Sequence, residues 1–305
     1  MHHNGLRKKI IVPIGMTLFL FSLSCSSSLA SFFRFIERSM AGLSERSVQV
    51  GDHKIVYLEG GKGESVLLLH GFGGDKDNWT RFARHITKKH HVIAPDLPGF
   101  GESSKIWTDR YDIFSQVKRV HGFVQKIGLK NFHLAGNSMG GNIAGVYAVL
   151  YPNEVLSLGL FASRGVISPL PSELSQELKK GNNPLIVQSI SDYDKLLDFI
   201  FVKKPFIPGS LKSYLAEKAL KNSKFNTKVF TEVGAPDQLQ RVMRFIRART
   251  LILWGDSDRV LNVSGAYVLK RGIRNSKIII MQSCGHVPMI ERPEEASKHY
   301  LEFIL

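Results

Sequence analysis

Short apolar runs alternate with longer amphipathic segments along most of the chain. Apolar runs bounded by glycine, proline and polar residues are typical of buried strands, and the segments between them have the spacing of helices. Strands that alternate with helices form a mostly parallel sheet covered by helices, so we expect an eight-stranded α/β sheet. Its strands are predicted near residues 47–52, 53–59, 65–70, 91–95, 131–136, 156–162, 250–254 and 277–282.

The alternation stops between residues 165 and 240, where helical stretches are interrupted by Pro205 and Pro208. An insertion before the strand near residue 250 predicts a helical lid over residues 165–240. The core would then comprise residues 47–164 and 241–305. The apolar faces of the lid would either cover a pocket for an acyl group or pack on the sheet in the ordinary way.

The chain begins with the form of an export signal. Arg7, Lys8 and Lys9 precede an apolar run over residues 10–23, and serines follow it. The run is shorter than the span of about 20 residues that a bilayer needs, which favours a cleaved signal over an anchor. Residues 1–30 therefore predict an export signal or membrane anchor, and an exported protein of the cell envelope, membrane-associated or secreted. Cleavage after Ala30 and lipid attachment at Cys25 are alternative forms of processing.

The next segment, residues 31–46, has apolar residues at roughly helical spacing and charged residues between them. This pattern predicts an amphipathic helix next to the membrane segment. Its apolar stripe would pack either on the protein itself or in the plane of a membrane surface. The stripe consists of Phe32, Phe33, Phe35, Ile36, Met40 and Leu43.

Composition supports one large folded unit, since 43% of the 305 residues are hydrophobic. The only cysteines are Cys25 and Cys284, so no intramolecular disulfide can form once the leader is removed. The net charge is +15, but the basic residues are scattered and form no nucleic-acid-binding motif. An anionic lipid surface and a merely basic composition both remain explanations of this charge.

The segment from Gly136 to Gly140 reads Gly-Asn-Ser-Met-Gly and lies between a predicted strand and a predicted helix. A nucleophilic serine must stand clear of the backbone on such a sharp turn, and the flanking glycines remove Cβ atoms that would clash there. The motif therefore identifies Ser138 as the candidate nucleophile.

A nucleophilic serine needs a base and an acid that orients the base. His286 and Asp258 each follow a predicted strand, and Ser138 does so too. Open parallel sheets place their sites at these strand ends. Asp256 lies in the same loop as Asp258 and competes with it for the role of the acid.

A glycine-rich loop follows the strand near residues 65–70, where the chain reads His-Gly-Phe-Gly-Gly from His70. The oxyanion of an acyl-transfer intermediate is bound by backbone N–H groups from such a loop and from the residue after the nucleophile. These donors would be Phe72 and Met139. For His70 we expect a structural hydrogen bond that holds the turn.

Four motifs, His-Gly-Phe-Gly-Gly, Asp-Leu-Pro-Gly-Phe-Gly-Glu-Ser, Gly-Asn-Ser-Met-Gly-Gly and Gly-His, together resemble the α/β-hydrolase superfamily over residues 47–305. The order Ser138, Asp258, His286 is the one that this superfamily uses. The segments from Gln116 to His121, from Val263 to Ala266 and from Cys284 to Pro293 resemble more closely a subgroup of monoacylglycerol lipases and bacterial lipases that carry an N-terminal membrane segment. The resemblance implies hydrolysis of carboxylic esters, with acylglycerols favoured, no metal or organic cofactor, and Asp258 as the acid.

Two other functions are weighed against this interpretation. Carbon–carbon hydrolases of aromatic degradation share the serine motif but typically carry tryptophan after Gly-His, where this chain has Val287. A non-catalytic binding module of the same fold is the other alternative. Fluorophosphonate labelling of Ser138 would distinguish an enzyme from such a module.

Overall fold

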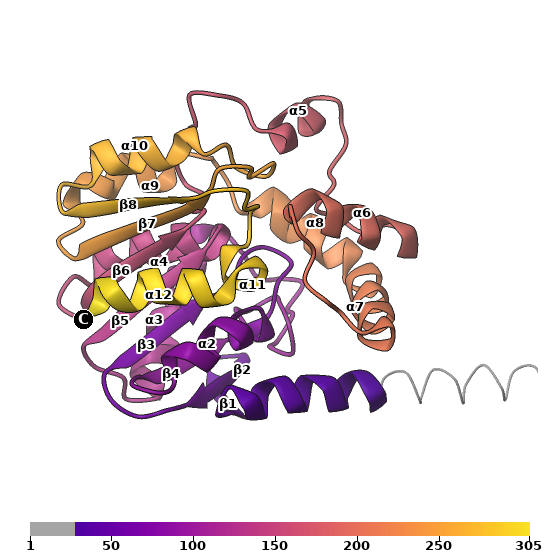
Figure 1. The fold of residues 1–305 in the computed structure, drawn as a ribbon, viewed down its shortest axis with the longest axis horizontal. Helices are drawn as coiled ribbons and strands as arrows, with labels where there is room; N and C mark the ends of the chain where they lie inside the picture. The colour runs from indigo at the N-terminus through magenta and orange to yellow at the C-terminus, as the bar shows by residue number, and fades with distance from the viewer. Residues whose placement is uncertain (1–27) are drawn as a thin grey trace, which may run out of the picture.

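An eight-stranded sheet runs through the protein in the order β1-β2-β4-β3-β5-β6-β7-β8 (Figure 1). The computed structural model describes residues 28–305. The predicted eight-stranded sheet is confirmed, although β1 begins at Leu43 rather than at residue 47. The strands are β1 Leu43–Val50, β2 His53–Gly60, β3 Ser65–Leu69, β4 His91–Pro95, β5 Phe132–Asn137, β6 Val155–Phe161, β7 Arg249–Gly255 and β8 Ser276–Met281.

The sheet is mostly parallel, as predicted. Only β1 with β2 and β2 with β4 pair antiparallel, whereas all other neighbouring strands of the sheet pair in parallel. The central strand β5 is buried along its whole length, as expected for a strand covered by helices on both faces. The parallel arrangement brings the carboxyl ends of β3, β5, β7 and β8 to one edge of the sheet.

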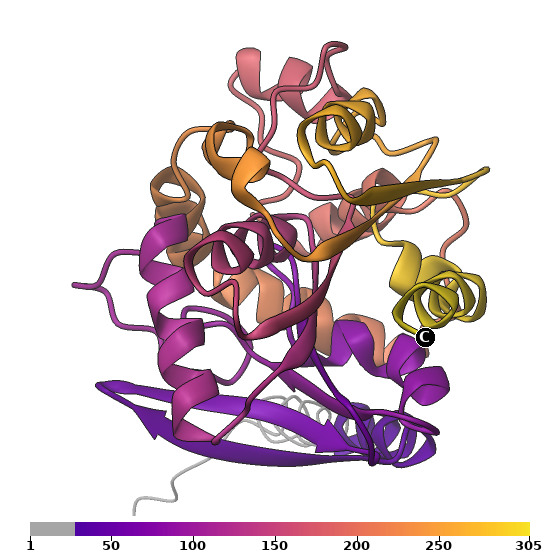
Figure 2. The same cartoon turned by 90° about the vertical axis from the view of Figure 1, so that its left-hand side faces the viewer.

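Helices cover both faces of the sheet (Figure 2). One apolar core contains side chains of α3, α4 and α10, and the second core contains side chains of α2 and α12. Trp79, Phe82 and Phe161 pack edge to face within the second core, with ring centroids 5.3 to 5.6 Å apart. These helices are α2 Thr80–Ile86, α3 Ile113–Lys126, α4 Met139–Leu150, α10 Ser264–Gly272 and α12 Pro293–Ile304.

The segment between β6 and β7 is helical, and α6 to α8 lie beyond one end of the sheet (Figure 1). We call residues 165–240 the insertion; its function as a lid stays a prediction. Its helices are α5 Glu173–Lys179, α6 Ile190–Ile200, α7 Gly209–Lys221 and α8 Ser223–Glu232, followed by α9 Gln238–Val242, which extends just past it.

The N-terminal helix is described over residues 28–40. The prediction of a helix to residue 46 is wrong at this end, because Gly42 turns the chain with φ 64° and residues 43–46 pair with β2. Residues 1–27 of the predicted export signal and the lipid attachment at Cys25 lie outside the described part. The end of that predicted segment, residues 28–30 with the cleavage site at Ala30, lies in the N-terminal helix, where Ala30 is buried. No helix within residues 28–305 has the length and apolar character needed to span a membrane.

The N-terminal helix contacts the protein through its charged side chains. Arg34 and Arg38 both donate hydrogen bonds to the carboxylate of Asp77, and Arg34 is only 8% exposed. Phe32 and Phe35, by contrast, are 56% and 65% exposed. One of the two alternatives is that the whole apolar stripe packs on the protein. That alternative is wrong for these two phenylalanines, because their side chains are exposed.

Candidate active site

Ser138 occupies the sharp turn between β5 and α4. Its backbone has φ 55° and ψ −116°, a conformation that side-chain-bearing residues rarely adopt. Three backbone hydrogen bonds hold it. Its N–H donates to the Phe161 carbonyl at 3.0 Å, and its carbonyl accepts from the N–H groups of Arg164 at 2.9 Å and Asn142 at 3.1 Å. The turn is thus fixed from β6 and from the first turn of α4.

Two glycines allow this turn to form. A Cβ atom on Gly136 would lie 2.2 Å from the Gly140 carbonyl oxygen, and one on Gly140 would lie 2.4 Å from the carbonyl oxygens of Leu69 and His70. Distances this short are steric clashes with backbone that cannot rotate away. The glycines of the Gly-x-Ser-x-Gly motif are therefore required by close backbone packing.

The imidazole of His286 lies beside the carboxylate of Asp258. His286 Nδ1 donates to Asp258 Oδ2 at 2.8 Å, and both residues are buried. The other carboxylate oxygen, Oδ1, accepts from the backbone N–H groups of Val260 at 2.8 Å and Leu261 at 2.9 Å. These bonds fix the carboxylate plane and leave His286 Nε2 unprotonated when the ring is neutral.

Asp256, the second carboxylate of this loop, accepts hydrogen bonds from other partners. Asp256 Oδ1 accepts from the hydroxyl of Ser257 at 2.8 Å and, weakly, from the backbone N–H of Cys284 at 3.4 Å. Asp256 thus supports the packing of two loops against each other, and the carboxylate beside the imidazole is that of Asp258.

Backbone contacts bring His286 to the serine turn. The N–H of His286 donates to the Ile200 carbonyl at the end of α6 at 2.9 Å. Its carbonyl accepts from the side-chain amide of Asn137, the residue before Ser138, at 3.1 Å. Ser138 and His286 line one cavity. Within residues 28–305 the Ser138 hydroxyl makes no hydrogen bond to the imidazole, as is common for catalytic groups without substrate.

The predicted oxyanion loop follows β3 and lies against the serine turn. A Cβ atom on Gly71 would lie 3.0 Å from Asn137 Oδ1 and 3.1 Å from Ser138 Cβ. No carbonyl oxygen of residues 28–305 accepts a hydrogen bond from the backbone N–H of Phe72 or of Met139. Both donors are therefore available to a ligand.

His70 has the structural position expected from the sequence. Its Nδ1 donates to the Gly71 carbonyl at 2.7 Å, and its Nε2 accepts from the backbone N–H of Leu97 at 2.9 Å. Burial lowers the pKa of His70, so the ring is neutral and can accept at Nε2. The histidine joins the oxyanion loop to the loop after β4.

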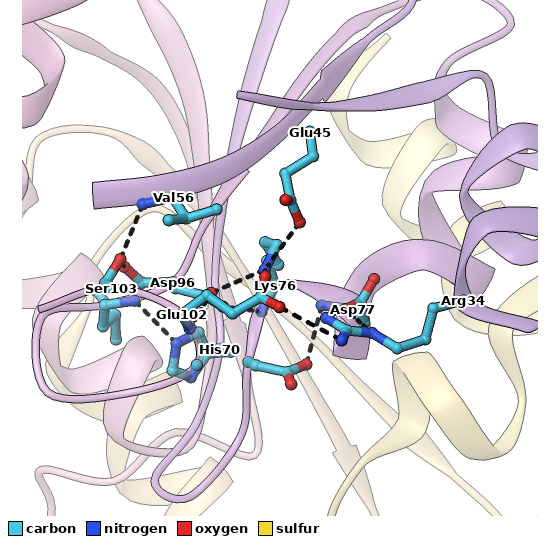
Figure 3. Close-up of polar contacts among 12 residues, drawn as sticks. Arg34, Glu45, Val56, His70, Lys76, Asp77, Asp96, Glu102 and Ser103 are labelled. Atoms are coloured by element: carbon cyan, nitrogen blue, oxygen red, sulfur yellow. Dashed lines mark hydrogen bonds and ion pairs between the residues drawn. The ribbon is translucent and has the colours of Figure 1, made fainter. Parts of the chain in front are cut away.

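A buried ionic cluster lies behind the oxyanion loop (Figure 3). The ammonium of Lys76, in the 3₁₀ helix η1 Lys76–Trp79, is fully buried and donates to Asp96 Oδ2 at 2.9 Å and to the Glu102 carboxylate. Arg34 of the N-terminal helix donates to Asp77 Oδ2 at 2.6 Å. Burial alone would raise the pKa of Glu102, but the hydrogen bond and charge of Lys76 lower it to about 2. The cluster thus connects the N-terminal helix to the loops around the site.

The cavity of about 200 Å³ next to Ser138 has walls of two kinds. Apolar side chains come mainly from the insertion, with Tyr193, Leu196, Leu197 and Ile200 of α6 and Leu215 of α7. Apart from the residues of the serine turn and His286, the polar side chains of the second group are Asp75, Asn78, Lys105, Lys218, Asn222 and Asn226. The sequence pattern did not indicate these lining residues, because they come from segments far apart in the chain.

Cys284, two residues before His286, is a packing residue, as expected. Its side chain is fully buried in the second core, and burial raises the pKa of its thiol to about 12. A thiol with such a pKa is not a nucleophile at neutral pH. Among residues 28–305, no cluster of three or more histidine, cysteine or acidic side chains has an arrangement that could hold a metal ion.

Comparison with known proteins identifies relatives over most of the chain. Residues 64–185 match the family described as alpha/beta hydrolase fold. The chain is 38% identical to Lipase 1 of Psychrobacter immobilis, covering 88% of this chain and 86% of that protein. It is 33% identical to monoacylglycerol lipase abhd6-B of Xenopus laevis, with 97% and 92% covered.

A solved structure is also similar to this chain in sequence and fold. The crystal structure of a membrane phospholipase A, described as a bacterial virulence factor, superimposes with a TM-score of 0.91 at 47% sequence identity, covering 95% of this chain and 96% of that one. Fold, strand-end geometry and sequence similarity therefore agree, and the chain belongs to the α/β-hydrolase family.

Proposed function

We propose that the protein is a serine esterase that hydrolyses carboxylic esters of lipids, with acylglycerols as substrates. The single observation that carries this proposal is the hydrogen-bonded pair His286 and Asp258 in the cavity that Ser138 lines. The lipases and monoacylglycerol lipases among its relatives support the ester as the bond that is cleaved.

The reaction would begin with attack of Ser138 Oγ on the ester carbonyl carbon while His286 Nε2 takes the hydroxyl proton. Asp258 holds the imidazole with its proton on Nδ1 and stabilises the imidazolium that forms. The backbone N–H groups of Phe72 and Met139 bind the oxyanion. His286 then gives its proton to the leaving alcohol.

A water molecule completes the cycle. His286 takes a proton from the water, whose oxygen attacks the acyl-enzyme carbonyl, and then returns that proton to Ser138 Oγ as the carboxylic acid leaves. No step requires a metal ion or an organic cofactor.

The apolar wall of the cavity supports a lipid acyl group as one part of the substrate. Four side chains of α6 and one of α7 lie there, and apolar lining with a few polar groups is typical of small-molecule sites. In this proposal the insertion is a lid that covers the acyl chain during the reaction.

We also propose that the protein is exported and that it binds to an anionic membrane surface through its N-terminal helix. Phe32 and Phe35 are exposed on that helix. Arg81 donates to Glu37 of the helix at 2.7 Å and to the Phe206 carbonyl at 3.0 Å, and the Phe206 side chain is 82% exposed. The helix and the loop before α7 thus both contact Arg81, and both carry exposed aromatic side chains. Such side chains bury apolar area at a lipid interface, and the basic charge of the chain adds attraction to anionic head groups.

The ester-hydrolase proposal is tested by replacing the nucleophile. Ser138→Ala should lower turnover of p-nitrophenyl octanoate and 1-octanoylglycerol by about a millionfold and abolish fluorophosphonate labelling. Ser257→Ala, which removes an exposed hydroxyl near the site, is the matched control and should keep full activity. Substantial activity of purified Ser138→Ala, or no labelling of the wild type, would overturn the proposal.

A further inference from the structure

The cavity beside Ser138 has a cationic part that a neutral acylglycerol does not need. Two lysines, Lys105 and Lys218, line it with one carboxylate, Asp75, and with the amides of Asn222 and Asn226. Glycerol carries no charge, so an ammonium group there has no counterpart in such a substrate. The charge state of each lysine shows which of the two is free to bind a ligand.

Lys218 is neutralised by the protein itself. Its ammonium donates to Asp75 Oδ2 at 2.9 Å, and both side chains are largely buried. Burial alone would raise the pKa of Asp75, but the charges of Lys218 and Arg34 lower it well below its usual range. Asp75 is therefore ionised and pairs with Lys218.

Lys105 has no such partner. Its ammonium donates to the Gly101 carbonyl at 2.8 Å, and no carboxylate of residues 28–305 lies within ion-pair distance of it. Burial lowers the pKa of Lys105, and the nearby charge of Lys218 lowers it further. The carboxylates of Asp96, Glu102 and Asp75 lie beyond ion-pair distance and offset this lowering only in part. A bound anion would offset both effects, because it would favour the charged ammonium.

The loop that carries Lys105 is fixed in place. Gly101, with φ 53°, lies so close to Asp96 that a Cβ atom would be 2.1 Å from its carboxyl carbon. Gly99, with φ 93°, lies against Tyr111 and Phe225 of α8. The position of Lys105 at the cavity is thus set by close backbone packing against the core and the insertion.

We propose that Lys105 binds the phosphate of a glycerophospholipid whose ester bond lies at Ser138 and whose acyl chain lies along α6. This inference rests on the proposed ester-hydrolase function and adds a head-group site to it. The phosphate of such a lipid is separated from the ester carbonyl by glycerol carbons, so its site must lie in the same cavity but away from the serine. Asn226 offers its side-chain amide to the remaining phosphate oxygens, and Asn222 Nδ2, which donates one hydrogen to the Lys218 carbonyl at 2.8 Å, has a second hydrogen to donate.

The carboxylate of a released fatty acid is a poorer fit for Lys105. That carboxylate forms at the carbon attacked by Ser138, next to the oxyanion donors Phe72 and Met139. A phosphate has more acceptor oxygens and a higher charge, and lysine binds it as a compact point charge.

The test compares two substrates that are monomeric in solution and differ only in the phosphate, 1-octanoylglycerol 3-phosphate and 1-octanoylglycerol. Lys105→Met should lower kcat/KM for the phosphate ester at least about tenfold, the usual effect of losing a hydrogen bond to a charged group, and change that for octanoylglycerol less than about twofold. Lys105→Arg should restore most of the preference. Lys126→Met, which removes an exposed charge from α3, is the control and should leave both values unchanged.

Four outcomes overturn the head-group site. In Lys105→Met, kcat/KM falls equally for both substrates, or it falls for neither. The wild type hydrolyses octanoylglycerol but not the phosphate ester, or the only effect of Lys105→Met is on inhibition by octanoate. Hydrolysis of neither ester by the wild type would instead overturn the proposed function itself. Lys105→Gln serves as a second neutral variant if Lys105→Met does not fold.

Discussion

Lys218 of α7 and Asp75 at the start of η1 form an ion pair of 2.9 Å that joins the insertion to the end of the oxyanion loop. Asp75 also accepts from the backbone N–H of Asp77 at 3.1 Å and so caps η1. One carboxylate therefore fixes both the loop after β3 and the helix above the cavity.

We expect Lys218→Met to lower the free energy of unfolding by about 1–3 kcal/mol, because it leaves a largely buried carboxylate oxygen without its donor. Urea unfolding of Lys218→Met, Asp75→Asn and the double variant gives the coupling energy of the pair. If the two single effects simply add, the ion pair does not hold the insertion.

Turnover should depend far more on Asp258, the carboxylate beside His286, than on Asp256. Asp258→Asn is expected to lower kcat about ten-thousandfold, because an amide favours the wrong tautomer of the imidazole. Asp256→Asn should keep most of the activity, since that side chain contacts Ser257 and the backbone of Cys284 instead. Steady-state kinetics with p-nitrophenyl octanoate compares the two variants. A larger loss in Asp256→Asn would mean that the acid is assigned to the wrong residue.

The aromatic side chains of the N-terminal helix should contribute to lipid binding. In protein lacking residues 1–27, replacing Phe32 and Phe35 with serine should weaken sedimentation with anionic vesicles at least about tenfold, because each phenylalanine loses a contact worth about 1.5–3 kcal/mol when buried. Phe245→Ser, at a site that is also exposed but lies in a different region, is the control. Hydrolysis of dissolved short-chain esters should be unaffected. Equal sedimentation of all three proteins would contradict a membrane-binding role for the helix.

His70 should make the fold sensitive to mild acid. Burial lowers its folded-state pKa below the ordinary 6.5, so the stabilisation from the neutral ring is complete above pH 6.5 and decreases as the pH falls below that value. The free energy of unfolding should therefore fall more steeply between pH 7 and pH 5 in the wild type than in His70→Asn. Urea unfolding across this range measures both slopes, and identical slopes would show that His70 does not take part.

The strands and the serine motif could be predicted because their signals are local. A buried strand is a run of apolar residues, and the turn at Ser138 needs glycines at fixed offsets. Asp258 follows the end of β7 by three residues and His286 follows the end of β8 by five, so the parallel sheet brings them to one edge. These features depend on the neighbouring residues in the chain.

The orientation of the N-terminal helix could not be predicted in the same way. Hydrophobic spacing places the apolar face of a helix toward the protein, but here Arg34 and Arg38 face inward because Asp77 lies opposite them. The same holds for Lys76 and Asp96, which are twenty residues apart in sequence. Ion pairs between distant segments leave no periodic pattern, so only the folded structure reveals them.

The strained backbone at Ser138 should lower the free energy of unfolding. Its backbone conformation costs about 1–3 kcal/mol for a residue with a side chain, and glycine would avoid that cost while losing about 0.4–1 kcal/mol through its freedom in the unfolded chain. Ser138→Gly should therefore unfold at higher urea than Ser138→Ala, although both lack the nucleophile. The strained backbone thus lies at the residue that we propose as the nucleophile, and the glycine variant, although it lacks the hydroxyl, would be the more stable protein.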